Sequence, residues 1–299
     1  MPSDRPDDLL ADPVARTRRF HRAVTTETGA LDASFLGRGR PLGPARVLNA
    51  IGHGRSDVAE IRAYLRLDSG LMSRLLRQLE DEGLVIVTRD AGDARRRLAT
   101  LTEKGAEEFA AYEALSDAQA EAILSRYPRP ETLLAAMDVV ATALGFDRTE
   151  IVETAPTDPR AVACLQAYYA ELGRRLKTGF DVSLSADPEA GDMMAPRGAF
   201  LVAVSDGMPI GCVGLKGTDK GYAEVKRLWT APSARGMGLA KRLMERLEAR
   251  ARALGIGLLR LDSNSALPEA IAMYRRLGWT EIDRFNDDPY PDHFFERHL

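Results

Sequence analysis

The sequence contains few of the side chains that hold metals or form disulfides. Its 299 residues include 2 cysteines and 4 histidines. Cys164 and Cys212 are far apart and neither belongs to a C-x-x-C pair, so neither a disulfide framework nor a zinc site is indicated. We therefore expect two reduced thiols in a cytoplasmic protein, and no bound metal.

Long apolar runs and a large net charge are missing as well. No apolar stretch approaches the roughly 20 residues of a membrane-spanning helix. Residues 1–8 are acidic and contain two prolines, and they lack the apolar segment of a secretory signal. We therefore expect no membrane partner. The formal net charge is −3, so any contact with nucleic acid must depend on a local basic surface.

The chain does contain enough apolar material for two cores. Hydrophobic residues make up 45% of it, and its length suits two domains of ordinary size. The last helical pattern of the first half ends near Gly145. In the second half, Pro156 and Pro159 close the first strand and open the first helix. The sequence therefore predicts a multidomain protein, with a mostly α domain over residues 1–148 and an α/β domain over residues 149–299.

Apolar periodicity predicts the elements of both halves. In the first half a short pair of strands lies among helices, with helices at 13–30, 42–53, 56–66, 69–83, 103–126 and 130–145 and strands at 84–88 and 98–101. In the second half strands and helices alternate, with strands at 151–155, 200–204, 210–216, 223–229, 258–261, 279–285 and 293–297 and helices at 159–177, 237–254 and 267–277. The pair Asp206-Gly207 favours a hairpin turn.

The helix over 69–83 has two distinct faces. One face is apolar and consists of Leu71, Met72, Leu75, Leu76 and Leu79. The opposite face begins with small residues and continues with cationic ones, namely Ser69, Gly70, Ser73, Arg74 and Arg77. Small residues allow close approach to a major groove, and arginine can bind guanine or phosphate. The alternative is the solvated face of an ordinary surface helix.

An arginine-rich loop joins the two short strands of the first half. Its end, Asp93 to Arg97, would place Arg95 and Arg96 over a minor groove. We expect Asp93 to hold Arg95 in place and not to touch DNA. The alternative is a charged surface turn.

Together these segments resemble the MarR family of winged-helix regulators. The resemblance runs from Pro41-Leu42-Gly43 through Leu76 and Leu79–Val85 to Asp93-x-Arg95 and Leu101-Thr102-x-Lys104-Gly105, and it covers roughly residues 12–146. It implies binding to double-stranded DNA and a homodimer whose first and last helices pair across a two-fold axis. One departure is the loop Arg89–Asp93, where the family commonly has a proline.

The run Arg235-Gly236-Met237-Gly238-Leu239-Ala240 precedes an amphipathic helix in the second half. A helix start offers unpaired N–H groups and the positive end of the helix dipole, and glycines let a pyrophosphate come close. Arg235 adds a charge-assisted hydrogen bond. A flexible turn before a helix is the alternative.

With its neighbours, this run resembles the GNAT acetyltransferase family over roughly residues 150–299. The residues that carry the resemblance are Ala223–Thr230, then Arg235, Gly238 and Ala240, then Leu258–Asn264, and finally Ala270-x-x-Met273-Tyr274 through Trp279. The resemblance implies a mixed sheet whose fourth and fifth strands splay apart, with acetyl-CoA as co-substrate in the gap. Backbone groups of Leu228, Trp229 and Thr230 would pair with the pantetheine arm. The amides of Gly236, Met237, Gly238, Leu239, Ala240 and Lys241 would hold the pyrophosphate, and Asn264 would contact the arm from the far side.

Two residues are candidates for proton transfer. Tyr274 lies where the family commonly keeps a general acid for the departing thiolate, and Glu224 on the fourth strand is the candidate base. The alternatives are a packed tyrosine at a helix end and a strand carboxylate paired with Lys226 or Lys220. The acceptor pocket would come from Tyr168, Tyr169, Arg174, Gly179–Asp181 and the tail Phe285–Glu296, although that tail can equally be an ordered surface loop.

The sequence thus predicts a bifunctional transcriptional regulator and N-acetyltransferase. It would move an acetyl group from acetyl-CoA to a primary amine of a small molecule or amino acid in a direct ternary complex. One rival is a regulator whose GNAT domain only senses acetyl-CoA. The other is an acetyltransferase whose helix-turn-helix only serves dimerisation. The acceptor, the operator and any coupling between the halves are not encoded in a recognisable pattern.

Overall fold

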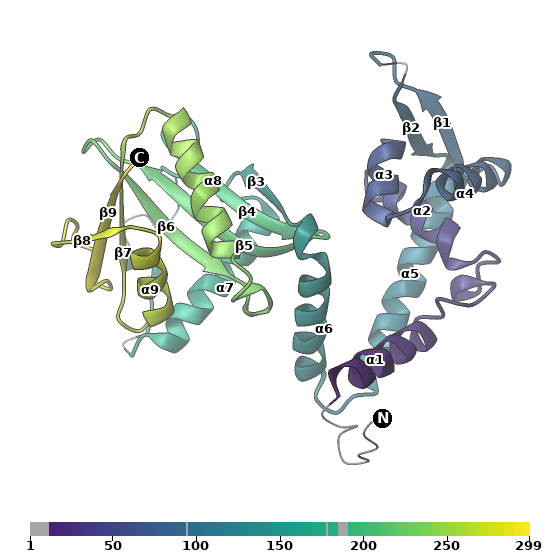
Figure 1. Ribbon diagram of the computed structural model, residues 1–299, viewed down its shortest axis with the longest axis horizontal. Coiled ribbons are helices and arrows are strands. Elements are labelled where there is room, and N and C mark those ends of the chain that lie inside the picture. Colours follow the sequence, from purple (N-terminus) through teal and green to yellow (C-terminus); the bar gives the residue numbers. More distant parts are fainter. Residues whose placement is uncertain (1–11, 94, 178, 185–190) are drawn as a thin grey trace, which may run out of the picture. The chain divides into compact units, whose positions relative to one another are not determined.

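The chain divides into two compact units, Met1–Pro128 and Arg129–Leu299. Figure 1 shows the computed structural model, which describes residues 12–93, 95–177, 179–184 and 191–299. The expected domain boundary, between residues 148 and 149, therefore lies inside the second unit. The reason is the helix α6 (Pro130–Gly145), which packs on the short helix η5 (Pro232–Ala234), with the Thr142 hydroxyl 3.1 Å from that of Ser233.

The first unit has the order of elements that periodicity predicts. The helices are α1 (Pro13–Glu27), α2 (Leu42–Gly52), α3 (Val58–Leu65), α4 (Ser69–Asp81) and α5 (Glu103–Ser125), and the antiparallel strands are β1 (Val85–Arg89) and β2 (Arg97–Leu101). A 3₁₀ turn, η2 (Phe35–Gly37), was not predicted. The Asp68 carboxylate caps α4 by accepting the Leu71 N–H at 2.8 Å, as its position before the helix favours.

Helix α4 is held by its apolar face. Met72, Leu75, Leu76 and Leu79 are buried in one core with residues of α2 and α3. Burial of such side chains stabilises the fold by roughly 1.5–3 kcal/mol each. Because this face is fixed against the core, the opposite face of α4 must remain at the surface.

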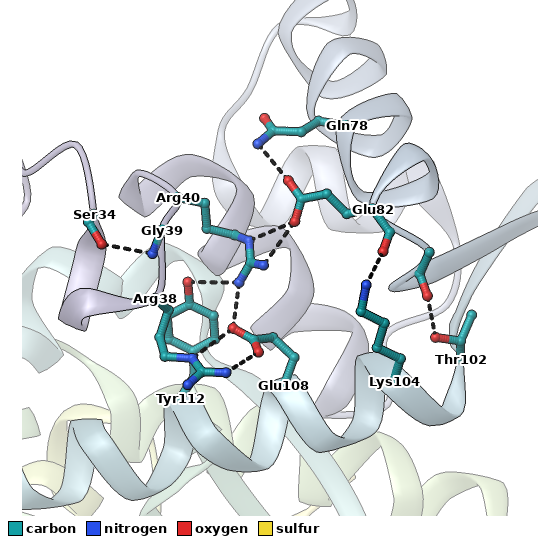
Figure 2. Close-up of polar contacts among 11 residues, drawn as sticks. Ser34, Arg38, Gly39, Arg40, Gln78, Glu82, Thr102, Lys104, Glu108 and Tyr112 are labelled. Carbon is teal, nitrogen blue, oxygen red and sulfur yellow. Dashed lines mark hydrogen bonds and ion pairs between the residues drawn. The ribbon is translucent and has the colours of Figure 1, made fainter.

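A cluster of ion pairs, drawn in Figure 2, ties the end of α4 to α5. The Arg40 guanidinium contacts Glu82 at 2.9 Å and Glu108 at 2.5 Å, and it donates to the Tyr112 hydroxyl at 3.2 Å. Arg38 also donates to Glu108, at 3.0 Å. The Arg38 hydrogen bond, opposed by burial and reinforced by Arg40, lowers the pKa of Glu108 to about 2. The cluster therefore contains an ionised carboxylate at any pH above that value.

We predict that Glu108→Gln destabilises the first unit by roughly 2 kcal/mol at neutral pH, less than the full pKa shift implies because Arg38 is partly exposed. The folded pKa of Glu108 lies below its ordinary value of 4.5, so this stabilisation is complete above pH 4.5 and is lost as the pH falls toward 2. Urea unfolding followed by far-UV circular dichroism measures it.

Two features of the chain make this test specific. Both tryptophans, Trp229 and Trp279, lie in the second unit, so their fluorescence should show an unchanged transition. The neighbouring exposed residue provides the control variant Glu107→Gln. Equal effects of the two variants would contradict a special role for the Glu108 cluster.

The second unit is a sheet covered by helices on both faces (Figure 1). After α6 and the turn η3 (Phe146–Arg148) its elements are β3 (Glu150–Thr154), α7 (Pro159–Arg175), η4 (Val182–Leu184), β4 (Ala199–Ser205), β5 (Met208–Gly217), β6 (Ala223–Thr230), η5, α8 (Leu239–Ala253), β7 (Leu258–Ser263), α9 (Pro268–Arg276), β8 (Thr280–Ile282) and β9 (His293–His298). Asp206 and Gly207 both have positive φ, as the expected hairpin turn requires.

The strand order is β3-β4-β5-β6-β7-β9-β8, and only β6 and β7 run parallel. Alternating residues of β4 point to opposite faces: Leu201 packs with α8, whereas Phe200 packs with α7. The predicted mixed sheet is therefore confirmed. The strand expected over 279–285 is shorter in the structure, where β8 has only three residues. In the sheet, β9 lies between β8 and β7.

Strands β6 and β7 separate after three paired residues. Ala223–Val225 pairs with Leu259–Leu261, and within the described chain no pairing of the two strands follows. A bulge in the β5–β6 ladder lies at the same point, where Arg227 has φ of 58°. The fourth and fifth strands thus splay apart as expected.

Candidate functional site

A cleft of about 660 Å³ opens where β6 and β7 diverge. Its walls come from the end of α7, the end of β6, the start of α8 and α9. Of the residues expected to bind a cofactor, the cleft is lined by Leu228, Trp229, Thr230, Arg235, Gly236, Gly238, Leu239, Ala240 and Lys241. Met237 and Asn264 are not in its lining. The size suits an elongated organic ligand.

The start of α8 forms one end of the cleft. Gly236 and Gly238 have φ of 76° and 85°, conformations that favour glycine, and Gly238 precedes the helix without a capping side chain. The backbone N–H groups of residues 236–241 make no hydrogen bond of good geometry within the described residues. Six unpaired donors at the positive end of a helix dipole form a binding site for an anion such as a pyrophosphate.

A chain of ion pairs borders the same cleft. Glu171 Oε2 accepts hydrogen bonds from Arg235 at 2.5 Å and from the Trp229 indole at 3.0 Å, and Arg175 bridges Glu171 to Glu269 on α9. Burial favours the neutral form of Glu171, but Arg235, Trp229 and Arg175 outweigh it, and its pKa is lowered. Arg235 thus lies in the cleft as predicted. Its carboxylate partner on α7 was not predicted.

A smaller cavity of about 120 Å³, here called the inner cavity, adjoins the cleft. The two share Tyr168, Leu172, Leu228, Leu267 and Ala270. Its outer wall is aromatic. The Phe180 ring lies 5.6 Å from Tyr169 and 4.8 Å from Tyr290, and the Tyr290 hydroxyl accepts the Asp181 N–H at 2.8 Å. Tyr168, Tyr169 and Phe180 from the expected acceptor pocket therefore meet here, together with part of the tail, whereas Arg174 does not line this cavity.

The two candidate proton-transfer residues lie on different cavities. Tyr274 is buried and lines the inner cavity. Burial and the charge of Asp262 raise its pKa, so the phenol stays protonated and can donate a hydrogen bond. Glu224 instead lines a third cavity of about 700 Å³, here called the polar basin, which is bordered by loops 216–220 and 284–288.

Asn264 serves the tail in this structure. Its amide nitrogen donates to the Tyr290 carbonyl at 2.6 Å, and its oxygen accepts the Ala266 N–H at 2.8 Å. Asn264 lines the inner cavity and not the cleft in which the pantetheine arm is expected. Its role toward a cofactor stays a prediction.

In the first unit, the exposed face of α4 carries the predicted DNA-binding residues. Ser69, Arg74 and Arg77 are exposed and Ser73 is half-buried. In the β1–β2 loop, Arg95 is exposed and its backbone N–H is bound by the Asp93 carboxylate at 3.0 Å. Asp93 thus orders the backbone of Arg95. Ala94, between them, lies outside the described residues.

Arg96 differs from the expectation. Its guanidinium donates to Asp57 Oδ2 at 2.8 Å, and Asp57 also caps α3 through the Ala59 N–H at 2.7 Å. The Arg96 hydrogen bond lowers the pKa of Asp57, although burial opposes it. In this structure Arg96 anchors the loop to α3, and this contact between distant segments was not visible in the sequence.

The described residues also bear on two other classes of feature, membrane-spanning helices and metal centres. None of the helices there is both long and apolar enough to cross a bilayer. No group of three or more His, Cys, Asp or Glu side chains in that part of the chain is arranged to hold a metal ion.

Comparison with known families matches each half separately. Residues 165–279 match the acetyltransferase (GNAT) family, and residues 39–96 match the MarR family. An IAA acetyltransferase of Azospirillum brasilense is 41% identical over 95 residues, which are 31% of this chain and 61% of that protein, so the chain spans less than two thirds of this relative. The uncharacterized N-acetyltransferase YjgM of Escherichia coli K12 is 30% identical over 137 residues, covering 44% of this chain and 80% of YjgM.

Among solved structures, an acetyltransferase of the GNAT family from Staphylococcus aureus Mu50 is 18% identical, with a TM-score of 0.45 over 50% of this chain and 99% of its own. The identity and coverage of YjgM, together with the two family matches, are decisive. This chain belongs to the GNAT acetyltransferase family through its second half, and residues 39–96 of its first half match the MarR family.

Proposed function

We propose that the protein transfers an acetyl group from acetyl-CoA to a primary amine of a small molecule or amino acid, and that its MarR-family domain binds double-stranded DNA as a transcriptional regulator. One observation carries the enzymatic part. Where β6 separates from β7, the cleft that begins at the amides of the α8 start adjoins the inner cavity that Tyr274 lines, and the two share five lining residues.

The cofactor would bind along this cleft. The amides of residues 236–241 and Arg235 hold the pyrophosphate. The edge of β6 at Leu228–Thr230 has lost its strand partner, so its backbone groups can pair with the amides of the pantetheine arm. The thioester then lies where the cleft meets the inner cavity, and the acceptor amine occupies that cavity.

Attack by the neutral amine on the thioester carbonyl forms the new C–N bond and then expels the CoA thiolate. Tyr274 is our candidate to donate a proton to that thiolate. Its raised pKa keeps the phenol protonated at neutral pH but also makes it a weaker acid, so the transfer depends on close contact between the phenol and the thiolate. Glu224 remains our candidate for the ultimate base. Its carboxylate lies beyond Lys226 as seen from the inner cavity, with 3.2 Å between Lys226 Nζ and Glu224 Oε2.

We predict that Gly238→Ala weakens binding of acetyl-CoA at least tenfold, because alanine strains a φ of 85° and places a methyl group at the pyrophosphate site. Isothermal titration calorimetry measures the affinity. Gly255→Ala is the matched control, since Gly255 has φ of 76° and equally open surroundings at the other end of α8. Equal losses in both variants would place the cofactor elsewhere.

Transfer itself is tested by mass spectrometry of products. Wild-type protein is incubated with acetyl-CoA and, in turn, amino acids, polyamines, aminoglycosides and peptides. At least one amine should gain an acetyl group in an enzyme-dependent way. If acetyl-CoA binds but no amine in the set is acetylated, the domain acts as a sensor and not as a transferase.

For the DNA-binding part, we predict that Arg77→Ala weakens operator binding about tenfold and lowers the salt dependence of the affinity by about one counterion. Arg77 is exposed on the outer face of α4. Arg22→Ala, which removes an exposed arginine from α1, is the control. Fluorescence anisotropy with a footprinted operator fragment gives the affinity and its salt dependence. Identical salt slopes for the two variants would contradict the role of Arg77 in binding DNA.

We further propose a homodimer. Several large apolar side chains are exposed on α1 and α6: Val14, Phe20, Val24, Leu134, Met137, Val139 and Leu144. Surfaces of this kind on the first and last helices of the predicted regulator domain suit a partner copy. Sedimentation equilibrium should give twice the chain mass of 32.7 kDa, and Val139→Asp should shift the protein toward the monomer. A monomeric wild-type protein would rule the dimer out.

A further inference from the structure

We infer that Asp262 accepts the proton of the acceptor amine and that Lys226 and Glu224 relay it to the polar basin. This inference rests on the proposed acetyl transfer. It adds two residues to the site, and it changes the part played by Glu224 from direct contact with the amine to the far end of a relay.

Asp262 lies on β7 and lines the inner cavity, whereas Glu224 does not. Its Oδ2 atom lies 2.5 Å from Lys226 Nζ and accepts a hydrogen bond from the Asn286 amide at 2.7 Å. Both contacts go to Oδ2, so Oδ1 remains as the acceptor for a bound amine. Asp262 and Asp288 both line this cavity, and Asp262 is the one whose carboxylate contacts Lys226, so we assign it to the nitrogen of the substrate.

Lys226 joins Asp262 to Glu224. The side chain of Asp262 is 13% exposed, that of Lys226 12% and that of Glu224 7%. Lys226 Nζ lies 3.2 Å from Glu224 Oε2. Glu224 Oε2 is fully buried but has no hydrogen bond, because the nearby ammonium is not directed at it. A small movement of Lys226 would form that bond. The chain carboxylate–ammonium–carboxylate thus connects the inner cavity with the polar basin.

The charge of this cluster favours a cationic substrate. Two buried carboxylates share one lysine, and Asp288, which borders both cavities, adds a further negative charge beside it. An excess of buried negative charge is costly until a cation arrives. Arg227, which also lines the inner cavity, offsets part of this negative charge. A protonated amine in the cavity would supply a further positive charge and place its protons against Asp262.

The proton balance of the step is then complete. The ammonium gives one proton to Asp262 and becomes the nucleophile. Lys226 gives one of its protons to Glu224 and takes the proton from Asp262, and Glu224 releases it to water in the basin. After the C–N bond has formed and the C–S bond has broken, Tyr274 protonates the thiolate, and the remaining extra proton of the amide nitrogen restores the phenol.

Charged and titratable groups face Asp262 from several elements. They are Lys226 and Glu224 on β6, Arg227 in the bulge, Tyr168 on α7, Tyr274 on α9 and Asp288 in the tail. Burial and the charge of Asp262 raise the pKa of both tyrosines, so both stay neutral at neutral pH. Burial would lower the pKa of Lys226, but Asp262 and Glu224 outweigh it and the pKa is raised, so Lys226 keeps its charge.

The experiment measures kcat against pH with the amine that the product screen identifies. Asp262→Asn and Asp262→Ala should lower kcat about a hundredfold with unchanged acetyl-CoA affinity, and added formate should restore part of the activity of the alanine variant. Lys226→Met should lower kcat about tenfold. It should also move the acidic limb of the profile to higher pH, because loss of a neighbouring cation favours the neutral form of a carboxylate. Lys226→Arg, which keeps the charge, should keep the limb in place.

Asp219→Asn is the control, since Asp219 borders the basin, is 90% exposed and pairs with Arg197 away from the cluster. Calorimetric binding of acetyl-CoA shows for each variant that the second unit is folded. Near-normal turnover by both Asp262 variants, or an unmoved acidic limb in Lys226→Met, overturns the relay while acetyl transfer by the wild type stands. A wild-type protein that binds acetyl-CoA but acetylates no amine overturns the proposed function and the relay with it.

Discussion

The loss of pairing between β6 and β7 after Val225 is the constraint on which the second unit depends. A parallel pair in the middle of a sheet normally continues, because each unpaired backbone group that is buried costs free energy. Here the bulge at Arg227 turns β6 away instead, and helices α7, α8 and α9 keep the gap open. The end of β6 that no longer pairs with β7 and the uncapped start of α8 both line the cleft. A ligand with amide groups in its arm and phosphates at its end satisfies both at once.

The first unit fixes one face of the helix α4 and leaves the opposite face exposed. Apolar contacts fix the buried face of α4, and the Arg40 cluster fixes its end against α5 (Figure 2). The exposed arginines therefore project from a rigid base. The protein is acidic overall, with net charge −3, so the proposed affinity for DNA would depend on this local arrangement and not on bulk charge.

Much of this could be predicted from the sequence, because the signals are local. The 3.6-residue period of Met72, Leu75, Leu76 and Leu79 gave the orientation of α4, and the glycines at 236 and 238 gave the start of α8 and its open amides. The hairpin at Asp206-Gly207 follows the same logic. Each of these depends on residues within one or two turns of the chain.

Contacts between distant segments could not be predicted in this way. Glu171 meets Arg235 across the cleft, Arg96 meets Asp57, and Lys226 meets Asp262 between two strands, and in each case one partner alone looks like an ordinary surface charge. For the same reason the sequence assigned α6 by its helical period to the first domain, whereas its contact through Thr142 belongs to the second unit. The position of β9 inside the sheet likewise depends on pairing and not on strand propensity.

A crystal structure of the protein with acetyl-CoA tests the central claim most directly. The account predicts the pyrophosphate on the amides of residues 236–241, the pantetheine arm along Leu228–Thr230, and the acetyl group where the cleft meets the inner cavity. A carrier bound at any other surface, with the gap between β6 and β7 filled by side chains, would contradict it.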